Sequence, residues 1–377
     1  MFTENVFDND SKIIVNLAHI GHNYHKLIKK LIQPGTKTIA MVKANAYGHG
    51  INEVSKHLET IGIDYLGVFS VSEACKIRKA GIESPILIFG IPHHTSFQLL
   101  SDLSVSLVVS SPNELNEVVE WTSSNKRSLT IHIKVDTGMS RLGFFPEMAR
   151  EEIRTTLRKY PNVLIEGLCT HFAESSAQDK SFTLLQGDIF KHLINLLNRD
   201  GIHIPVIHAA NSGAVLHYPE FHFSAVRPGI LLYGISPDET QIPELKPALS
   251  IESYVGNIKT LATGSYVSYG RTYRCSRPTT IAVIPLGYAD GLPLGLSNQG
   301  NVIINNFLCP ILGSICMNQF MVDISNCPGA TIGSKAILIG YSQDHSISVH
   351  DVAKQASTIP YDILCRLPSC AHRIFLE

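Results

Sequence analysis

Several residues with chemically capable side chains follow short apolar runs in this sequence. They are Lys43 in "MVKANAYGHG", Arg141 in "DTGMSRLGF", His171 in "THFAESS", Asn211 and Ser212 in "HAANSG", and Arg227 in "VRPGI". A lysine at a strand end can pair with a carboxylate, anchor a phosphate or condense with a carbonyl. Each residue alone has a simpler explanation, such as an ion pair, a structural histidine or a turn cap. Together they indicate a catalytic or binding site.

The elements that must position these residues alternate between apolar runs and amphipathic segments. The runs read TIAMV, DYLGVF, PILIF, SLVV, IHIKV, VLIEGL, IPVIH and FSAV. Segments such as "NEVSKHLETIG" and "SPNELNEVVEWT" between them carry apolar residues at helical spacing. This alternation predicts an α/β protein with a parallel sheet. Eight units predict an N-terminal (β/α)8 TIM barrel over residues 12–244, with its chemistry at the carboxyl ends of the strands. An open, doubly wound sheet is the alternative.

The last third of the chain has a different pattern. Short β-branched and aromatic runs such as "SIESYVGNIKTL", "TIAVIPLGY" and "AILIGY" are separated by Gly, Pro and Asn turns. This pattern predicts a C-terminal, mainly β domain over residues 245–377, with one late helix near Val349–Ala356.

Composition narrows the class of protein. The 377 residues favour two domains, and 31 basic against 32 acidic side chains give no reason to expect a nucleic-acid partner. No apolar stretch is long enough to span a membrane, and the start "MFTENVFDND" lacks the apolar core of a secretion signal. Eight cysteines without CxxC spacing favour reduced thiols and a cytoplasmic protein, and we expect no metal site.

Two of the strand-end positions favour a phosphate group. Ser212 follows the seventh predicted strand and Gly229 follows the eighth, where barrels often bind phosphate. A hydroxyl and free backbone N–H groups suit that ligand. A lysine beside a phosphate site fits a phosphorylated aldehyde, pyridoxal 5'-phosphate.

Longer motifs give the chain a specific resemblance. It resembles the alanine racemases, pyridoxal-phosphate enzymes with a barrel and a C-terminal β domain, over nearly its whole length. The motifs are "MVKANAYGHG", "KVDTGMSRLGF", "EGLCTHFA", "HAANSG", "RPGILLYG", "LKPALS", "VSYGRTY", "PLGYADG" and "ICMNQ". The resemblance implies a racemase that interconverts L- and D-alanine and supplies D-alanine for peptidoglycan.

The resemblance also implies roles for the cofactor-binding residues. Lys43 would form the internal aldimine, and the pocket would include Asn211. The phosphate would be bound by Tyr47, Ser212 and the backbone of Gly229 and Ile230. Arg141 would contact the phenolic oxygen of the cofactor and the substrate carboxylate. His171 would lie against the pyridine ring, Arg227 would donate to the pyridine nitrogen, and His208 would be the partner of Arg227.

The remaining implied roles concern the substrate. Tyr269 resembles the second catalytic base, which a homodimeric family member receives from its partner subunit. Tyr288 would line the entrance, and the backbone N–H of Met317 would hold the carboxylate. Lys134 aligns with a lysine that is carbamylated in some members, and an unmodified ion pair is the alternative.

Racemisation removes the Cα proton from one face and returns it on the other, so two bases are the simplest arrangement. Lys43 and Tyr269 would supply these bases. Because both side-chain types have pKa values of about 10, both pKa values must be lowered for the residues to act near neutral pH. Arg227 stays protonated, so it would not place a proton on the pyridine nitrogen. The ring is then a weaker electron sink, which favours racemisation over transamination.

Two positions depart from the family pattern. Asn318 stands where an aspartate is common, and Ser369 stands where many relatives carry a tyrosine at the mouth of the site. We expect Ser369 to relax the specificity toward serine; if the tail is aligned one position away, Cys370 is the substitute. Two other functions stay open: another pyridoxal-phosphate enzyme with this architecture, such as an amino-acid decarboxylase, or a non-catalytic pyridoxal-phosphate-binding protein.

Overall fold

The computed structural model describes residues 11–238 and 240–377, which form two compact units. The barrel unit comprises residues 19–46 and 51–246, and the β unit comprises residues 11–18, 47–50 and 247–377. The opening segment "MFTENVFDND", on which the absence of a secretion signal was predicted, lies outside the described residues. Within the described residues, no helix is both long and apolar enough to cross a membrane.

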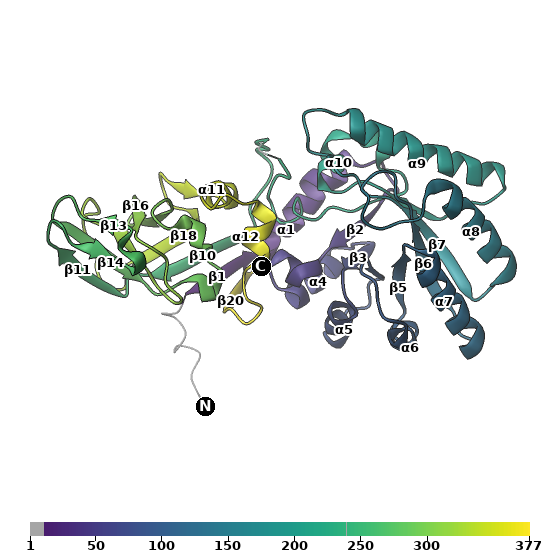
Figure 1. Ribbon diagram of the computed structural model, residues 1–377, viewed down its shortest axis with the longest axis horizontal. Helices are drawn as coiled ribbons and strands as arrows, with labels where there is room; N and C mark the ends of the chain where they lie inside the picture. The colour runs from purple at the N-terminus through teal and green to yellow at the C-terminus, as the bar shows by residue number, and fades with distance from the viewer. Residues whose placement is uncertain (1–10, 239) are drawn as a thin grey trace. The chain divides into compact units, whose positions relative to one another are not determined.

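The barrel unit is a closed parallel barrel, which confirms the predicted α/β fold (Figure 1). All eight predicted runs form strands, and in the described residues each pairs in parallel with its neighbours, with β9 closing onto β2. The strands are β2 (Lys37–Met41), β3 (Tyr65–Val68), β4 (Ile86–Ile88), β5 (Val105–Val109), β6 (Leu129–Lys134), β7 (Val163–Cys169), β8 (Val206–His208) and β9 (Ala225–Val226).

Helices alternate with these strands along the chain. They are α1 (Leu17–His22), the π-helical η2 (Asn23–Ile28), α2 (Lys29–Leu31), α4 (Ile51–Thr60), α5 (Val71–Lys79), η3 (His94–Ser96), α6 (Phe97–Asp102), α7 (Pro112–Asn125), α8 (Pro146–Lys159), α9 (Ser181–Arg199), α10 (Ser212–His217) and η4 (Pro219–Phe221).

Local sequence explains where several barrel elements begin. Ser70 caps α5 and forms a capping box with Glu73, and Ser111 caps α7 with a proline in the first turn. The strands are rich in Val, Ile and Leu because a parallel sheet is covered on both faces; all of β3 and β4 is buried.

One irregularity in the barrel lies between β6 and β7. Ile131 pairs with Ile165, but the next residue, His132, pairs with Gly167. Glu166 is therefore an extra residue on β7 with no partner on β6, as in a β-bulge. Bulges reorient the side chain of the extra residue, and the carboxylate of this glutamate, whose side chain is 30% exposed, lies within hydrogen-bond distance of His132 and Tyr65.

The β unit is mainly β, as predicted, and is built on a mixed sheet. Among the described residues its strand order is β11-β14-β17-β16-β15-β18-β10-β1-β20, with β19 paired to β18 and a separate β12–β13 hairpin. The strands are β1 (Lys12–Asn16), β10 (Leu249–Tyr254), β11 (Asn257–Leu261), β12 (Tyr266–Val267), β13 (Tyr273–Arg274), β14 (Thr279–Ile284), β15 (Asn301–Ile304), β16 (Phe307–Leu312), β17 (Phe320–Asp323), β18 (Lys335–Tyr341), β19 (Ser346–Ile347) and β20 (Arg373–Leu376).

Short helices complete the β unit. They are η5 (Tyr269–Arg271), η6 (Tyr288–Asp290), η7 (Leu294–Leu296), α11 (Val349–Gln355) and α12 (Pro360–Cys365). The predicted late helix corresponds to α11, whereas α12 was not predicted. Strand β1 pairs antiparallel with β10 and parallel with β20. The segment 12–244, predicted as the barrel, thus begins with a strand of the other sheet.

Candidate active site

Lys43 lies two residues after β2, at the start of a left-handed turn, the element α3 (Lys43–Tyr47). Ala44, Asn45 and Ala46 have φ values of 53°, 54° and 54°, and Tyr47 follows at 51°. Left-handed backbone costs about 1–2 kcal/mol per residue when the residue is not glycine, so this turn must be held in place. The Glu73 carboxylate accepts a hydrogen bond from the Ala44 N–H (2.6 Å). The backbone therefore follows a left-handed turn directly after the lysine.

Arg227 follows β9, and its side chain is buried in a dense set of acceptors. Nη1 donates to His208 Nδ1 (2.8 Å), and Nη2 donates to the carbonyls of Thr170 and Ala209 (2.8 Å each) and to His171 Nδ1 (3.2 Å). Nε takes part in none of the hydrogen bonds among the described residues. Burial lowers the pKa of Arg227 to about 10, so the guanidinium is protonated at neutral pH.

The contacts of Arg227 determine the state of two histidines. Because an arginine only donates hydrogen bonds, Nδ1 of both His171 and His208 must accept. Each ring is therefore neutral and carries its proton on Nε2. Burial, with the Arg227 charge next in importance, lowers the pKa of both rings well below the usual value, in agreement with this assignment.

Ser212, the first residue of α10, is hydrogen-bonded to the backbone of the segment that follows Arg227. Ser212 Oγ accepts from the N–H groups of Gly229 (2.9 Å) and Leu231 (3.4 Å). Ile230 is fully buried, yet its N–H has no acceptor among the described residues. Asn211 Oδ1 accepts from Ser175 Oγ (2.6 Å), which orders the loop before the helix. A hydroxyl and a buried, unsatisfied N–H fit an anionic group such as a phosphate.

Lys134 and Arg141 belong to the same side of the barrel unit. Lys134 ends β6 and is buried, and Arg141 is exposed on the loop that follows. Burial lowers the pKa of Lys134, and the charges of Arg141 and Arg227 act in the same direction. Asp136 Oδ1 accepts from the N–H groups of Gly138 (2.9 Å) and Ser140 (3.0 Å), which shapes the loop carrying Arg141.

In the β unit, three segments with predicted roles are hydrogen-bonded into one surface. Ser314 Oγ donates to the Tyr269 carbonyl (3.0 Å), the Tyr288 N–H donates to Cys316 O (3.1 Å), and the Ala289 N–H donates to Met317 O (2.9 Å). Tyr269 is 75% exposed, Met317 56% and Tyr288 43%. Asn318 is also exposed, beside Met317.

Tyr47 and Ser369 likewise belong to the β unit. The Tyr47 ring lies 6.1 Å from the ring of Tyr361, and burial raises the pKa of Tyr47, with Tyr361 as a smaller cause. Arg373 donates from Nε to Gly48 O (2.9 Å) and from Nη1 to Ser369 O (3.2 Å). One arginine thus connects the turn after Tyr47 with the tail that carries Ser369, which is exposed.

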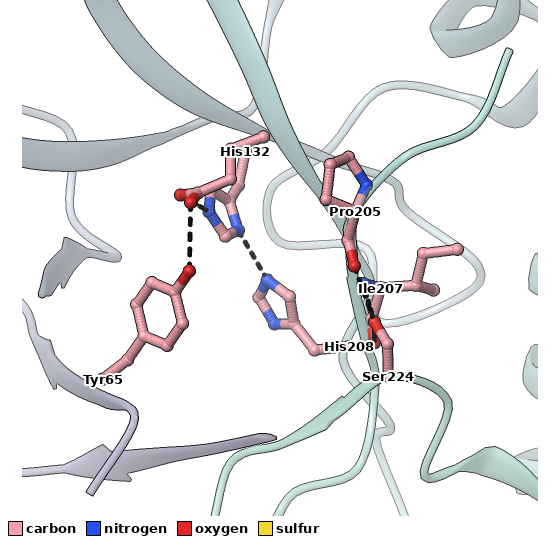
Figure 2. Close-up of polar contacts among 7 residues, drawn as sticks. Tyr65, His132, Pro205, Ile207, His208 and Ser224 are labelled. Carbon is pink, nitrogen blue, oxygen red and sulfur yellow. Dashed lines mark hydrogen bonds and ion pairs between the residues drawn. The ribbon is translucent and has the colours of Figure 1, made fainter. Parts of the chain in front are cut away.

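A chain of polar residues inside the barrel was not predicted. His208 Nε2 donates to His132 Nδ1 (2.8 Å), His132 Nε2 donates to Glu166 Oε2 (3.0 Å), and Tyr65 Oη donates to Glu166 Oε1 (3.0 Å). Figure 2 shows Tyr65, His132 and His208 pointing toward one another along this chain. The signal in the sequence was a histidine within "IHIKV" and a glutamate within "VLIEGL", two polar residues inside buried strands.

Comparisons with known proteins agree with this architecture. The family model for the alanine racemase N-terminal domain matches residues 15–237, and the model for the C-terminal domain matches residues 248–375. An alanine racemase of Methanococcus maripaludis is 37% identical and covers 96% of this chain and 98% of its own. The solved alanine racemase of Clostridium difficile 630 superposes with a TM-score of 0.91 at 32% identity, covering 98% of this chain and 96% of its own.

A second solved structure bears on the cofactor. The alanine racemase of Bartonella henselae, solved with covalently bound pyridoxal phosphate, has a TM-score of 0.88 at 27% identity and covers 97% of this chain and 99% of its own. Both domains, in the same order and over nearly the full length, are thus shared with these proteins, and the chain belongs to the alanine racemase family.

Proposed function

We propose that this chain is a pyridoxal-phosphate-dependent enzyme that interconverts L- and D-alanine. The observation that carries the proposal is the buried, protonated Arg227 held between two neutral imidazoles at the end of the barrel where the Lys43 turn begins. A cation at this point matches a racemase and disfavours a decarboxylase, which would place a carboxylate against the ring nitrogen.

The residues present fit the cofactor. The buried Ile230 N–H lacks an acceptor among the described residues, and with the Ser212 hydroxyl it would donate to a phosphate. The Gly229 N–H, which donates to Ser212 Oγ in this structure, lies beside them and would contribute once the phosphate is bound. Nε of Arg227 would donate to the ring nitrogen, His171 would pack against the ring, and Lys43 would carry the cofactor. Asn211 orders the phosphate-binding loop, and Tyr47 would add its hydroxyl. When bound, pyridoxal phosphate withdraws electrons from the substrate Cα and so makes its proton acidic.

The chain itself supplies the proton transfers. Lys43 and Tyr269 would exchange protons with opposite faces of Cα, each acting as base in one direction and as acid in the other. Arg227 keeps its own proton at neutral pH, so it would donate a hydrogen bond to the ring nitrogen without protonating it. An arginine at this position would therefore favour return of the proton to Cα, which gives the other enantiomer, over formation of a transamination product.

Other residues would bind and select the substrate. Arg141 and the Met317 N–H would hold the carboxylate, Tyr288 would line the entrance, and a carbamate on Lys134 would pair with Arg141. Asn318 in place of an aspartate changes the charge near this group, and Ser369 leaves room for serine as a second substrate. The exposed Tyr269 would enter the site of a partner subunit in a homodimer. Such an enzyme would work in the cytoplasm and supply D-alanine for peptidoglycan.

The experiment that tests the proposal combines an assay with a label. Purified protein given pyridoxal phosphate and L-alanine should form D-alanine, and borohydride should fix the cofactor on Lys43, as peptide mapping would show. Lys43→Ala should lose both properties. Lys79→Ala, which changes an exposed lysine at the last residue of α5, serves as the control. A labelled but inactive protein would indicate a pyridoxal-phosphate-binding protein instead, and an unlabelled protein would refute both functions.

A further inference from the structure

Arg227 is a buried cation with no carboxylate beside it. It is 4% exposed, its polar partners are two imidazoles and two backbone carbonyls, and among the described residues it forms no ion pair. An uncompensated buried charge is costly. The hydrogen-bond chain that starts at Arg227 does reach a carboxylate, that of Glu166, by way of His208 and His132.

The two ends of this chain allow only one arrangement of protons. Arg227 can only donate, and an ionised Glu166 can only accept. His208 therefore accepts at Nδ1 and donates from Nε2, and His132 does the same. The His132 hydrogen bond lowers the pKa of Glu166, which keeps that carboxylate ionised near neutrality. All hydrogen bonds point from the arginine to the glutamate, so each link is satisfied without a charge on either ring.

Three features of the barrel are built around this chain. The bulge between β6 and β7 leaves Glu166 as the extra residue on β7. Gly167 lies under the His132 ring: a Cβ at this position would be 2.0 Å from His132 Nδ1, so only glycine leaves the ring its place. Tyr65, from β3 on the opposite side of the barrel, fixes the second carboxylate oxygen. A generic apolar core requires none of these features.

We propose that Glu166 is a positioning residue for Arg227, setting the tautomers of His132 and His208 and thereby holding the guanidinium with Nη1 and Nη2 on protein acceptors, so that Nε stays outside these hydrogen bonds. The inference rests on the proposed function, in which Nε faces the ring nitrogen of the cofactor. Glu166 acts over two rings and does not touch the cofactor or the substrate. Without its acceptor, His132 can turn or change tautomer, and His208 then no longer offers a fixed Nδ1 lone pair to Arg227.

Neutron diffraction of deuterated crystals tests the proton arrangement directly, with or without the cofactor. In the unaltered protein, deuterium should lie on Nε2 of His132 and of His208 and be absent from both Nδ1 atoms. Deuterium on Nδ1 of His208 would overturn the inference. Because this measurement needs no activity, it decides the proton arrangement even if the protein proves not to be a racemase.

Variants of Glu166 test the consequence for the reaction. Glu166→Ala should lower kcat by about tenfold to a hundredfold, the loss typical of partners that orient a functional group, with little change in KM. It should also raise the amount of pyruvate formed by transamination per turnover. Glu166→Gln should restore most of the rate, because the amide oxygen still accepts from His132.

The matched control is Glu59→Ala. Glu59 is a carboxylate of the same unit. It accepts hydrogen bonds from the N–H groups of Glu83 and Ser84 and from Ser84 Oγ, but it contacts no residue of the hydrogen-bond chain from Arg227 to Glu166. It should leave kcat and the pyruvate yield unchanged. Equal losses in Glu59→Ala and Glu166→Ala, or wild-type partitioning in Glu166→Ala, would show that Glu166 is merely structural. If Glu166→Ala does not fold, the tautomers of the unaltered protein and the rate of Glu166→Gln still decide the question.

Discussion

In the barrel unit the candidate site residues are mostly buried and interlocked, whereas in the β unit most of them are exposed. Arg227 makes four hydrogen bonds and is 4% exposed, but Tyr269 and Met317 are 75% and 56% exposed. In the barrel unit, most candidate site residues are therefore also part of the packing that stabilises the fold. In the β unit, most candidate site residues lie on the surface and contribute little to packing.

This difference separates two kinds of mutational effect. A change at a buried, hydrogen-bonded position alters stability and function together, because the same contacts serve both. A change at an exposed tyrosine alters function with little effect on folding. The exposure of Tyr269 also suits its role in the proposed homodimer, in which this side chain would enter the site of the neighbouring subunit.

The largest effect is expected for Tyr269→Phe. Loss of the second base should lower racemisation by about 10²- to 10⁴-fold, while the free energy of unfolding should change by no more than about 0.5 kcal/mol because the residue is on the surface. Racemisation must slow equally in both directions, since the two enantiomers have the same free energy. Deuterium uptake at Cα from solvent, measured separately for each enantiomer, should be lost for one and largely kept for the other. Equal, small losses would contradict the two-base scheme.

Gly167→Ala should, in contrast to Tyr269→Phe, clearly lower the free energy of unfolding. Overpacking of a core typically costs about 1–3 kcal/mol, and we expect the upper end because the His132 ring above Gly167 is fully buried. Trp121, the sole tryptophan of the chain, lies on α7 and so reports unfolding of the barrel in urea by its fluorescence.

The control for this prediction lies in the β unit. A Cβ on Gly256 would be 3.5 Å from its nearest neighbour, an ordinary contact, so Gly256→Ala should change stability little. A Gly167→Ala protein with the urea midpoint of the unaltered chain would show that the His132 ring is not fixed.

Acid should destabilise the barrel. Burial lowers the pKa values of His132, His171 and His208 in the folded protein, whereas in the unfolded chain they are near 6.5. Unfolding then takes up protons as the pH falls below about 6.5, so stability is retained above that pH and lost below it, by up to about 1.4 kcal/mol per pH unit for each ring.

The urea midpoint of Trp121 fluorescence at pH 7.5, 6.5 and 5.5 measures this loss. We expect little change over the first step and a clear fall over the second. A midpoint that stays constant to pH 5.5 would mean that these rings are already charged in the folded state, contrary to their hydrogen bonds with Arg227.

The smallest effect is expected for Ser369→Tyr. A larger side chain at this exposed position of the tail should raise the preference for alanine over serine by the equivalent of about 1–3 kcal/mol, the usual limit for a methylene-sized discrimination. The measurement is the ratio of kcat/KM values for the two amino acids. Cys370→Tyr is the control for the alignment of the tail: if it changes the ratio and Ser369→Tyr does not, the position was assigned one residue too early.

Much of the fold follows from local pattern in the sequence. Each barrel strand is a short apolar run between helical segments, and in a parallel barrel the residues after such runs share one end. The sequence therefore predicts that Lys43, His171, Ser212 and Arg227 share one site. Strand β1 was not predicted as part of the β sheet because its partners β10 and β20 lie more than 200 residues away in sequence.

Other features depend on register and backbone angles that no single segment specifies. His132 and His208 are 76 positions apart, and Glu166 meets His132 only because of the β-bulge. The left-handed turn after Lys43 contains no glycine until Gly48, so composition gives no sign of it. Hydrogen bonds from the Ala44 N–H to Glu73, on a different helix, and from the Ile51 N–H to Asn45 Oδ1 help to hold it.

The bare backbone of Gly167 beneath the His132 imidazole has a consequence for evolution. Among relatives, a side chain at position 167 should occur only where position 132 has become small, so the two sites should vary as a pair. Relatives that keep a histidine at position 132 should therefore also keep a glycine at position 167.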